Sequence, residues 1–441
     1  MELTRRQLLA LLGAGGAAAA TGVGLAGCAR DVTAVDVGAA GFGDGARGTV
    51  EMWCRSDTVN GVQAVVDAFH AAQDRIRVDL TPIQNGQYVT KVATAIRGGR
   101  VPDVIDIDDI YSTMFAFRDV FTDLTPLVED LALGDTLSPG HLALATKDGR
   151  NYGVPFLGDF SVLFCNTELF DRAGLDVDEH TASFDGILEA ARAISALDDN
   201  TYGWSFPGNA SGALGFTVQP HVWATGTDLI EGEVGDQRGN VAGNDALRRT
   251  LDLERTLWEE KLVPSGCFSD DASRWSADYV AGRLGMFPAG YGVVAPNASP
   301  ELLERSRVVL LPGPDGGRAF FDGGDNLCMP EGGKNPEAAT ELIRFAVALE
   351  QQSRMPDGFY SPIRSDVVTP EFDAAHPLVV PTLKSLDSGY APTTLAYNLI
   401  YNQQDGPWLR MFRRAVFDGE VDAAMDEAQT TYDRILRQAQ A

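Results

Sequence analysis

Five segments near the start of the chain decide its fold. They are TVEMWC at Thr49–Cys54, NGVQAVVDAFHAAQ at Asn60–Gln73, IRVDL at Ile76–Leu80, YVTKVATAIR at Tyr88–Arg97 and VIDI at Val104–Ile107. The first, third and fifth are short and apolar enough to predict strands, and the second places its apolar residues on one side of a helix. This order predicts a βαβαβ unit, because parallel strands are joined by crossover helices. We therefore expect an α/β fold with mainly parallel sheets that are flanked by helices.

The alternation of strands and helices continues along the rest of the chain, and no internal repeat interrupts it. Strands are predicted at 163–166, 284–288 and 308–311, and helices at 184–197, 244–261, 337–350 and 421–438. With 441 residues, the chain exceeds one average domain, and we expect two or three.

The net charge narrows the possible partners. Asp and Glu number 62 against 35 Lys and Arg, which gives a formal charge of −27 at pH 7. Such a surface repels phosphate backbones, so nucleic acid is not expected as a partner. An anionic membrane would not hold this protein by charge either.

The first thirty residues are typical of an export signal. Thr4-Arg5-Arg6-Gln7-Leu8-Leu9 is a twin-arginine pattern, the run from Leu8 to Gly27 carries no charge, and Leu25-Ala26-Gly27-Cys28 is similar to a lipobox. A transmembrane anchor is the alternative, but Gly and Ala are poor membrane anchors. We predict a twin-arginine lipoprotein signal at 1–27, a flexible tether at 28–47, and a lipid on Cys28. The protein would then be held at the outer face of the cytoplasmic membrane.

Four further cysteines remain after Cys28. None of them forms a C-x-x-C pair, which argues against zinc-ribbon and thioredoxin-like sites. Cys54, Cys165 and Cys328 each lie in an apolar run, which favours buried free thiols. A disulfide that involves Cys267 stays open at this stage.

Signatures of the common enzyme classes are missing from the sequence. The five histidines are too far apart for a helical metal motif, and neither a G-x-S-x-G elbow nor a Walker A loop is present. A pair of carboxylates for glycoside hydrolysis is a geometric feature, and the sequence leaves it open. We expect a protein without enzymatic activity, metal or cofactor.

A series of short motifs carries a resemblance to a known family. The motifs are Gln87-Tyr88 with Lys91 and Gly98-Gly99-Arg100-Val101-Pro102-Asp103-Val104, Tyr152-Gly153-Val154-Pro155-Phe156, Leu163-Phe164-Cys165-Asn166-Thr167-Glu168-Leu169-Phe170 with Ala173-Gly174-Leu175, Gly282-Arg283-Leu284-Gly285-Met286, Leu311-Pro312-Gly313-Pro314, and Lys334-Asn335-Pro336-Glu337-Ala338-Ala339. Each is weak alone, but together and in this order they resemble bacterial extracellular solute-binding proteins of family 1, the maltose-binding-protein-like group. Phe184-Asp185-Gly186-Ile187 stands where the family has a tryptophan motif, so that motif is degraded.

The resemblance implies a two-lobed periplasmic-binding-protein fold, in which three crossings of the chain form a hinge. We place the crossings near 156–160, 321–325 and 361–364. The N-terminal lobe would then comprise 48–157 plus 322–361, and the C-terminal lobe 158–321 plus 362–441. The family implies a substrate receptor, a monomer, that binds its ligand between the lobes and hands it to the permease subunits of an ABC transporter.

The carboxyl ends of the predicted strands indicate where ligand would bind, because loops at that edge of an open α/β sheet surround the ligand site. The loop after the first strand offers Arg55 and Asp57, although Asp57 could instead cap the next helix. The third strand runs into Asp108, Asp109 and Tyr111, whose acids could accept sugar hydroxyls, bind calcium or be solvated.

The resemblance adds further candidates for ligand contact. Asp159, in the first crossing, matches an acidic residue that contacts sugar in family members. The others are the aromatic residues Phe216, Trp275, Tyr291 and Tyr397, then Asp322 and Gly324 at the second crossing, and Tyr360 and Arg364 at the third. Arg364 could instead make a structural ion pair.

These observations together predict an exported, lipid-anchored receptor for a sugar or oligosaccharide. The alternative within binding proteins is a receptor for glycerol phosphate or another charged solute, with Arg55 and Arg364 as the clamp. A secreted glycosidase and a surface adhesion lipoprotein are the alternatives from other classes.

Overall fold

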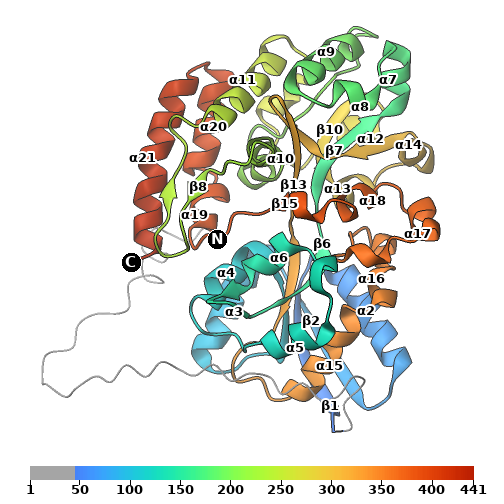
Figure 1. The fold of residues 1–441 in the computed structure, drawn as a ribbon, viewed down its shortest axis with the longest axis vertical. Coiled ribbons are helices and arrows are strands. Elements are labelled where there is room, and N and C mark those ends of the chain that lie inside the picture. The colour runs from blue at the N-terminus through green and yellow to red at the C-terminus, as the bar shows by residue number, and fades with distance from the viewer. Residues whose placement is uncertain (1–44) are drawn as a thin grey trace, which may run out of the picture. The chain divides into compact units, whose positions relative to one another are not determined.

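A computed structural model of the chain describes residues 45–441, which lie within one compact unit (Figure 1). The predicted signal at 1–27, the lipidation site at Cys28 and all of the tether before residue 45 lie outside the described residues. Within residues 45–441, no helix combines the length and the hydropathy needed to cross a membrane.

The first lobe is built on a five-stranded sheet of order β2-β1-β3-β14-β6. Strand β1 spans Gly48–Arg55, β2 Ile76–Ile83, β3 Val104–Asp108, β14 Gly324–Cys328 and β6 Val154–Gly158. The predicted βαβαβ unit is confirmed, since β1 pairs in parallel with both β2 and β3 through α2 (Val59–Ala72) and α3 (Asn85–Gly98). Strand β14 pairs antiparallel with β3 and β6, because it enters this sheet from the second lobe.

The second lobe contains a six-stranded sheet with the path β10-β7-β13-β12, to which β11 adds at β7 and β15 at β13. The strands are β7 (Ser161–Asn166), β10 (Met286–Gly290), β11 (Ser306–Val309), β12 (Leu311–Gly313), β13 (Gly316–Phe321) and β15 (Gly389–Tyr390). Only the β13–β15 pair is parallel. The expectation of mainly parallel sheets therefore holds for β2-β1-β3 and not for this lobe, where a short return such as that between β12 and β13 forces antiparallel pairing.

The remaining elements cover the two sheets (Figure 1). In the first lobe these are α4 (Asp109–Ala116), α5 (Thr125–Leu131), η1 (Gly134–Thr136), α6 (Pro139–Leu144), β4 (Thr146–Lys147), β5 (Arg150–Asn151), α15 (Pro336–Ala346), α16 (Leu349–Gln352) and η3 (Met355–Gly358). In the second lobe they are α7 (Thr167–Ala173), α8 (Val177–His180), α9 (Phe184–Ser195), α10 (Ser211–Trp223), β8 (Ile230–Glu231), β9 (Arg238–Gly239), α11 (Asp245–Glu259), η2 (Ser265–Phe268), α12 (Ala277–Val280), α13 (Tyr291–Val294), α14 (Pro300–Glu304), η4 (Ser365–Val367), α17 (Pro370–Ala375), α18 (Val380–Leu383), η5 (Leu386–Ser388), α19 (Tyr397–Tyr401), α20 (Pro407–Phe417) and α21 (Val421–Ala439).

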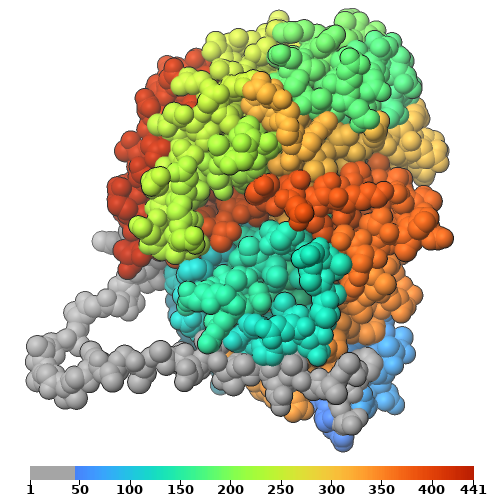
Figure 2. Space-filling view, in the orientation of Figure 1, coloured from blue at the N-terminus to red at the C-terminus, as the bar shows by residue number. Residues whose placement is uncertain are grey.

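The chain passes between the lobes three times. It leaves β6 and enters β7 over Asp159 and Phe160, and it returns from β13 to β14 over Asp322 and Gly323. The third passage follows Ser361, which pairs with Gly158 of β6. Figure 2 shows the orange segment that begins near residue 350 lying across the junction of the lobes, where η5 and β15 contact α6.

Each lobe has its own apolar core. In the first lobe, Val62, Val65, Val66 and Phe69 form the buried face of α2. Phe69 meets Phe345 edge-on, with ring centroids 5.2 Å apart. Burying a side chain of this size contributes roughly 2 to 3 kcal/mol, so the face that the periodicity predicted is also the face that holds α2 to its lobe.

The cysteines agree with the favoured interpretation of the sequence. Cys54, Cys165, Cys267 and Cys328 are all free and buried. Cys267 lies 3.4 Å from the Ser205 hydroxyl and makes no disulfide. Burial raises the pKa of the Cys165 thiol to about 12, so it stays protonated and unreactive at neutral pH.

Two elements are shorter in the structure than the sequence pattern predicts. The helix predicted at 337–350 breaks after Ala346 and resumes at α16, because side chains take over the freed carbonyls. Gln352 Nε2 donates to Ala346 O at 3.1 Å, and Arg364 Nη1 donates to Val347 O at 2.9 Å. The strand predicted at 308–311 is divided between β11 and β12, which pair with different partners.

Glu254 provides a test of the second core. It is 1% exposed on α11, and Trp204 Nε1 donates to its carboxyl at 3.1 Å. Burial raises the pKa of Glu254 to about 8, so the folded state holds this proton more tightly than the unfolded chain does. Its contribution to stability is present in acid and is lost as the pH rises through about 8. We expect the free energy of unfolding to fall by about 1 kcal/mol between pH 7 and pH 9.

The variant Glu254→Gln removes the titration and keeps the acceptor for Trp204. Urea denaturation at both pH values should show a smaller decrease for this variant than for the wild type. Equal decreases in the two proteins would contradict the placement of Glu254.

Candidate functional site

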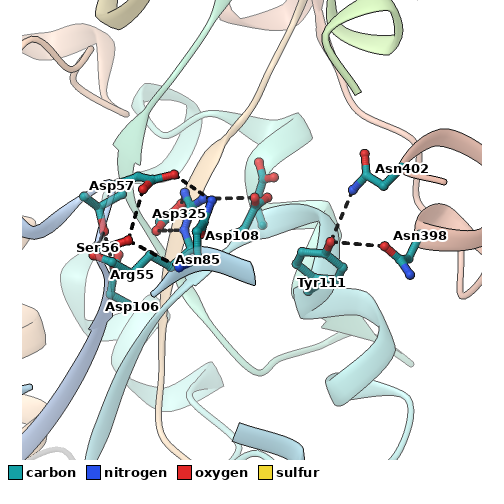
Figure 3. A network of polar contacts seen from close by, with 12 residues as sticks. Arg55, Ser56, Asp57, Asn85, Asp106, Asp108, Tyr111, Asp325, Asn398 and Asn402 are labelled. Atoms are coloured by element: carbon teal, nitrogen blue, oxygen red, sulfur yellow. Dashed lines mark hydrogen bonds and ion pairs between the residues drawn. The ribbon is translucent and has the colours of Figure 1, made fainter. Parts of the chain in front are cut away.

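Arg55 is the centre of a polar network at the carboxyl edge of the first sheet (Figure 3). It ends β1, and both β3 and β14 bring an aspartate to it. Its Nε donates to Asp325 Oδ2 at 2.9 Å and Nη2 donates to Asp325 Oδ1, while Nη1 reaches Asp108 Oδ2 at 3.2 Å. The guanidinium is thus held by two carboxylates, one of them in the paired geometry that suits arginine best.

Burial and charge act against each other in this network. The Asp325 side chain has no exposed surface, and those of Arg55 and Asp108 are 14% and 24% exposed. Burial opposes the charge on Arg55, but Asp325 and Asp108 outweigh it and raise the pKa of Arg55 well above its ordinary value. Burial raises the pKa of Asp108 to about 7, although Arg55 opposes this shift. Arg55 therefore stays charged, and Asp108 can titrate near neutral pH.

The two aspartates of β3, Asp106 and Asp108, lie in different environments. Asp106 is fully buried and accepts a hydrogen bond from Thr58 Oγ1 at 2.5 Å. Burial and the nearby Asp325 raise the pKa of Asp106 well above its ordinary value, which favours a protonated side chain. Asp106 thus supports the start of α2, while Asp108 at the strand end keeps some access to solvent.

Asp109, His141 and Asp322 form a second, fully buried group. His141 Nε2 lies 3.6 Å from Asp109 Oδ2, and its Nδ1 lies 4.0 Å from Asp322 Oδ1. Asp322 Oδ2 accepts hydrogen bonds from the Ser138 hydroxyl and, at 3.1 Å, from the His141 amide. Burial lowers the pKa of His141 to about 4 and raises that of Asp322 to about 7. This group anchors α6 to the second crossing inside the protein.

Asp159 differs from every carboxylate described so far. It occupies the first crossing, its side chain is exposed, and no side chain or backbone group among residues 45–441 bonds to or pairs with its carboxylate. A Cβ at Gly290 would lie 2.5 Å from Asp159 Oδ1, so the carboxylate rests against the end of β10. Although the side chain is exposed, neighbouring protein atoms partly desolvate the carboxylate and raise the pKa of Asp159. Arg55 lowers this pKa and Asp325 raises it, which places Asp159 in the neighbourhood of the Arg55 network.

Aromatic side chains gather beside Asp159. Tyr360 donates its hydroxyl to Asp57 O at 2.7 Å and packs on the first core. Tyr291, half-buried, begins α13 directly after β10. Phe359 has a φ of 68°, is 41% exposed, and its carbonyl would lie 3.2 Å from a Cβ at Gly292. A bulky residue at positive φ is uncommon and marks a locally strained backbone.

Tyr111 joins the two lobes. Its hydroxyl donates to Asn398 Oδ1 at 3.4 Å and accepts from Asn402 Nδ2 at 3.2 Å. Tyr111 lies on α4 of the first lobe, whereas Asn398 lies on α19 of the second and Asn402 directly follows it. Figure 3 shows these three side chains meeting beside the Arg55 network.

The structure brings together seven of the predicted ligand residues around the lobe junction, at its first and third crossings and along the carboxyl edge of the first sheet. These are Arg55, Asp57, Asp108, Tyr111, Asp159, Tyr291 and Tyr360. Asp57 does not cap α2. Its exposed carboxylate accepts hydrogen bonds from Asn85 Nδ2 at 2.6 Å and Ser56 Oγ at 3.1 Å instead. Phe216 is half-buried and meets Phe321 edge-on at 4.8 Å.

The structure buries the other six predicted ligand residues. Asp109 and Asp322 belong to the internal group with His141. Trp275 packs edge-on against Phe287 at 5.6 Å, and Tyr397 is 1% exposed. Arg364 pairs with Asp366 and so makes the structural ion pair that the sequence left open. The last of the six is Gly324, which opens β14 with a φ of 146° in contact with β6.

Several residues of the junction were missed by the sequence reasoning. Asp325 lies inside the predicted second crossing, so an acidic residue at this position could have been predicted as part of the site. Asn398 and Asn402 stand one helical turn apart near the C-terminal end of the chain, and Phe359 follows a glycine without any motif. Only the fold reveals that these four meet residues of the other segments.

Across residues 45–441, no group of three or more His, Cys, Asp or Glu side chains is arranged to hold an ion. Surface hollows on α9 and between α5 and α6 lie away from the Arg55 network.

The dependence of the junction on Arg55 can be tested by stability. Arg55→Gln leaves the buried Asp325 carboxylate without its cation, and removing one partner of a buried pair costs about 3 to 5 kcal/mol. We expect a loss of this size in urea denaturation at pH 7. The double variant Arg55→Gln/Asp325→Asn should recover part of the loss, because no charge is then left unpaired. A double variant no more stable than Arg55→Gln would show that the pair is not the cause.

Comparisons with known proteins agree with the geometry. The family model described as bacterial extracellular solute-binding protein matches residues 55–353. A binding protein of Brucella abortus (strain 2308) is 21% identical over 383 residues, covering 85% of this chain and 89% of the relative. The arabinooligosaccharide-binding protein of Bacillus subtilis (strain 168) is 23% identical over 272 residues, 59% of each chain.

Solved structures show the same fold. The sugar-binding protein MalE from Xanthomonas citri superimposes with a TM-score of 0.78 at 21% identity, covering 89% of this chain and 98% of the other. The GacH receptor of Streptomyces glaucescens gives a TM-score of 0.73 at 22% identity, with 89% and 99% covered. Since the family model spans more than half of the 441 residues, the chain belongs to the bacterial extracellular solute-binding proteins.

Proposed function

We propose that this protein is the substrate receptor of an ABC importer and binds a sugar or oligosaccharide between its lobes. Its family consists of solute-binding proteins. Relatives are named for arabinooligosaccharide and lactose, and solved neighbours include a maltose-bound MalE3 of T. maritima. Delivery of the ligand to a permease follows from membership of the family.

Asp159 is the observation that carries the proposal. It is an exposed carboxylate with free acceptor oxygens, at the chain crossing where both lobes meet. A carboxylate accepts two hydroxyl hydrogen bonds from adjacent sugar carbons, and charge-assisted bonds of this kind are about twice as strong as neutral ones. Tyr291, Tyr360 and Phe359 lie beside it and offer rings for the apolar C–H faces of a sugar.

The other junction residues take supporting roles in this proposal. Asp57 and Asp108 present carboxylate oxygens at the carboxyl edge of the first sheet. Tyr111 lies beside them at the start of α4, where its hydroxyl is already bonded to Asn398 and Asn402. Arg55 acts chiefly by positioning Asp108 and Asp325, because both carboxylates already occupy its guanidinium. Phe216 lies on α10 in the second lobe and is available as a further ring.

A receptor for glycerol phosphate fits the structure less well. Arg55 and Arg364 were the expected clamp, and both are already paired with aspartates. Asp57 and Asp159 would also repel a phosphate group. A neutral polyhydroxy ligand needs no unpaired arginine and is not repelled by these aspartates.

The proposed action is binding without bond cleavage, by closure of the lobes around the ligand. A sugar recovered unchanged after prolonged incubation supports this. Release of shorter sugars or of a chromogenic aglycone would instead favour the glycosidase alternative.

Export and anchoring form a separate part of the proposal, and the support comes from sequence patterns at Arg5-Arg6 and Leu25–Cys28. We expect the wild-type protein to fractionate with membranes when it is expressed with its own signal. Cys28→Ser should prevent lipidation and release the exported protein into the soluble fraction. A Cys28→Ser protein that stays as membrane-bound as the wild type would argue against lipid on this cysteine.

A thermal-shift screen tests ligand binding. The probes are lactose, maltotriose and arabinotriose, with glycerol 3-phosphate as the charged alternative. A sugar at 100 times its dissociation constant should raise the free energy of unfolding by about 2.7 kcal/mol. A response to glycerol 3-phosphate alone would overturn the sugar assignment.

Asp159→Asn tests the site. Loss of the charged acceptor should weaken the best sugar probe at least about tenfold, or about 1.4 kcal/mol, without lowering the melting temperature of the free protein. Asp74→Asn is the matched control, because Asp74 is also exposed but precedes β2 at the opposite edge of the same sheet. Equal affinities for the wild type and Asp159→Asn would remove Asp159 from the site.

A further inference from the structure

Outside the three crossings, the Tyr111 side chain of the first lobe forms hydrogen bonds to side chains of the second lobe. The hydroxyl is bonded at once as donor to Asn398 and as acceptor to Asn402, at 3.4 and 3.2 Å. Burial and the charge of Asp108 raise the pKa of Tyr111 to about 12, so the hydroxyl keeps its proton at physiological pH. Titration of Tyr111 therefore does not disrupt either bond near neutral pH.

On the first-lobe side, helix α4 connects Tyr111 to the candidate ligand site. Asp108, which pairs with Arg55 at 3.2 Å, directly precedes α4, and Tyr111 lies in the first turn of that helix. The ring also packs on the second lobe's core. A shift of Asp108 toward a ligand would thus move the start of α4 and the Tyr111 hydroxyl with it (Figure 3).

On the second-lobe side, the amides are held by neighbouring elements. A Cβ at Gly212 would lie 3.0 Å from Asn402 Oδ1, so the first turn of α10 fits closely against this amide. Asn398 belongs to α19, whose Tyr397, Ile400 and Tyr401 are buried in the same lobe. The two amides therefore move together with the second lobe.

We propose that Tyr111, Asn398 and Asn402 form an interlobe latch, which sets the balance between open and closed arrangements of the lobes and so tunes the affinity of the site. The proposal rests on the function proposed above, in which closure accompanies ligand binding. The latch is made of neutral groups, it spans the two lobes, and one turn of helix separates it from the Arg55 network.

The physical consequence is a shift in populations. A contact made only in the closed arrangement biases the equilibrium by its own free energy, and a ligand that requires closure binds more weakly when the closed fraction falls. Net contributions of neutral hydrogen bonds lead us to expect a change of about fivefold to tenfold in the open-to-closed ratio when the hydroxyl is removed.

The experiment measures lobe separation without any ligand. Spin labels are attached at Ala64→Cys on α2 and Glu189→Cys on α9, two exposed positions in different lobes, in the full chain with Cys28→Ser. The four remaining cysteines are buried and will not compete for the label. Tyr111→Phe keeps the ring and removes the hydroxyl, and Asn402→Ala removes one amide. Both should move the distance distribution from the shorter population toward the longer one.

Tyr279→Phe is the matched control. It also loses a tyrosine hydroxyl bond, to Ser306 at 2.8 Å, but both residues of this bond lie in the second lobe. We expect lower thermal stability for this variant and an unchanged distance distribution. Identical distributions for the wild type, Tyr111→Phe and Asn402→Ala would overturn the latch, and so would an equal shift in Tyr279→Phe.

The sugar titration separates this inference from the proposed function. With the best sugar probe from the thermal-shift screen, Tyr111→Phe should bind about fivefold to tenfold more weakly, and saturating sugar should restore the short distance. If no sugar binds the wild type, the proposed function fails while the ligand-free distances still decide the latch. If sugar binds but distances and affinity are unchanged in Tyr111→Phe, the latch alone fails.

Discussion

The ion pair between Arg55 and Asp325 is the contact on which the rest of the junction depends. It joins β1 to β14, strands 270 residues apart in sequence, and it is buried on the side of Asp325. Strand β14 reaches the first sheet only after the chain has built most of the second lobe. The pair therefore holds the returning chain at the carboxyl edge of the first sheet, and the other carboxylates of that edge are arranged around it.

Arg55 is bonded to only some of these acids, and this separates their roles. Asp108 and Asp325 are the acids that accept hydrogen bonds from Arg55, whereas Asp106 relies on Thr58 and Asp322 on Ser138 and His141. These acids belong to the framework. Asp159 is left with free oxygens at the surface of the junction, so the availability of a carboxylate follows from the partners of its neighbours.

The sequence pattern predicted most of the first lobe because its information is local. The periodicity of α2 and the order of segments from 49 to 107 are enough for the βαβαβ unit. Strand direction in the second sheet depends on which distant segments pair, and a local sequence pattern does not encode this pairing. The same limit applies to the site: Asp159 and Asp322 both look like isolated acids at a crossing. Only the 181-residue contact between His141 and Asp322 distinguishes the buried one.

The positions of the crossings explain how binding and closure can be coupled in such a chain. Asp159 lies on the first crossing, Asp322 on the second, and Ser361, beside Gly158, on the third. A group bound at Asp159 therefore touches the backbone segments that must rotate when the lobes move. The Asp109–His141–Asp322 group keeps the second crossing seated in the first lobe during that rotation, because moving it would expose three buried polar side chains to a new environment. Motion must then be concentrated in the backbone on either side of this anchor.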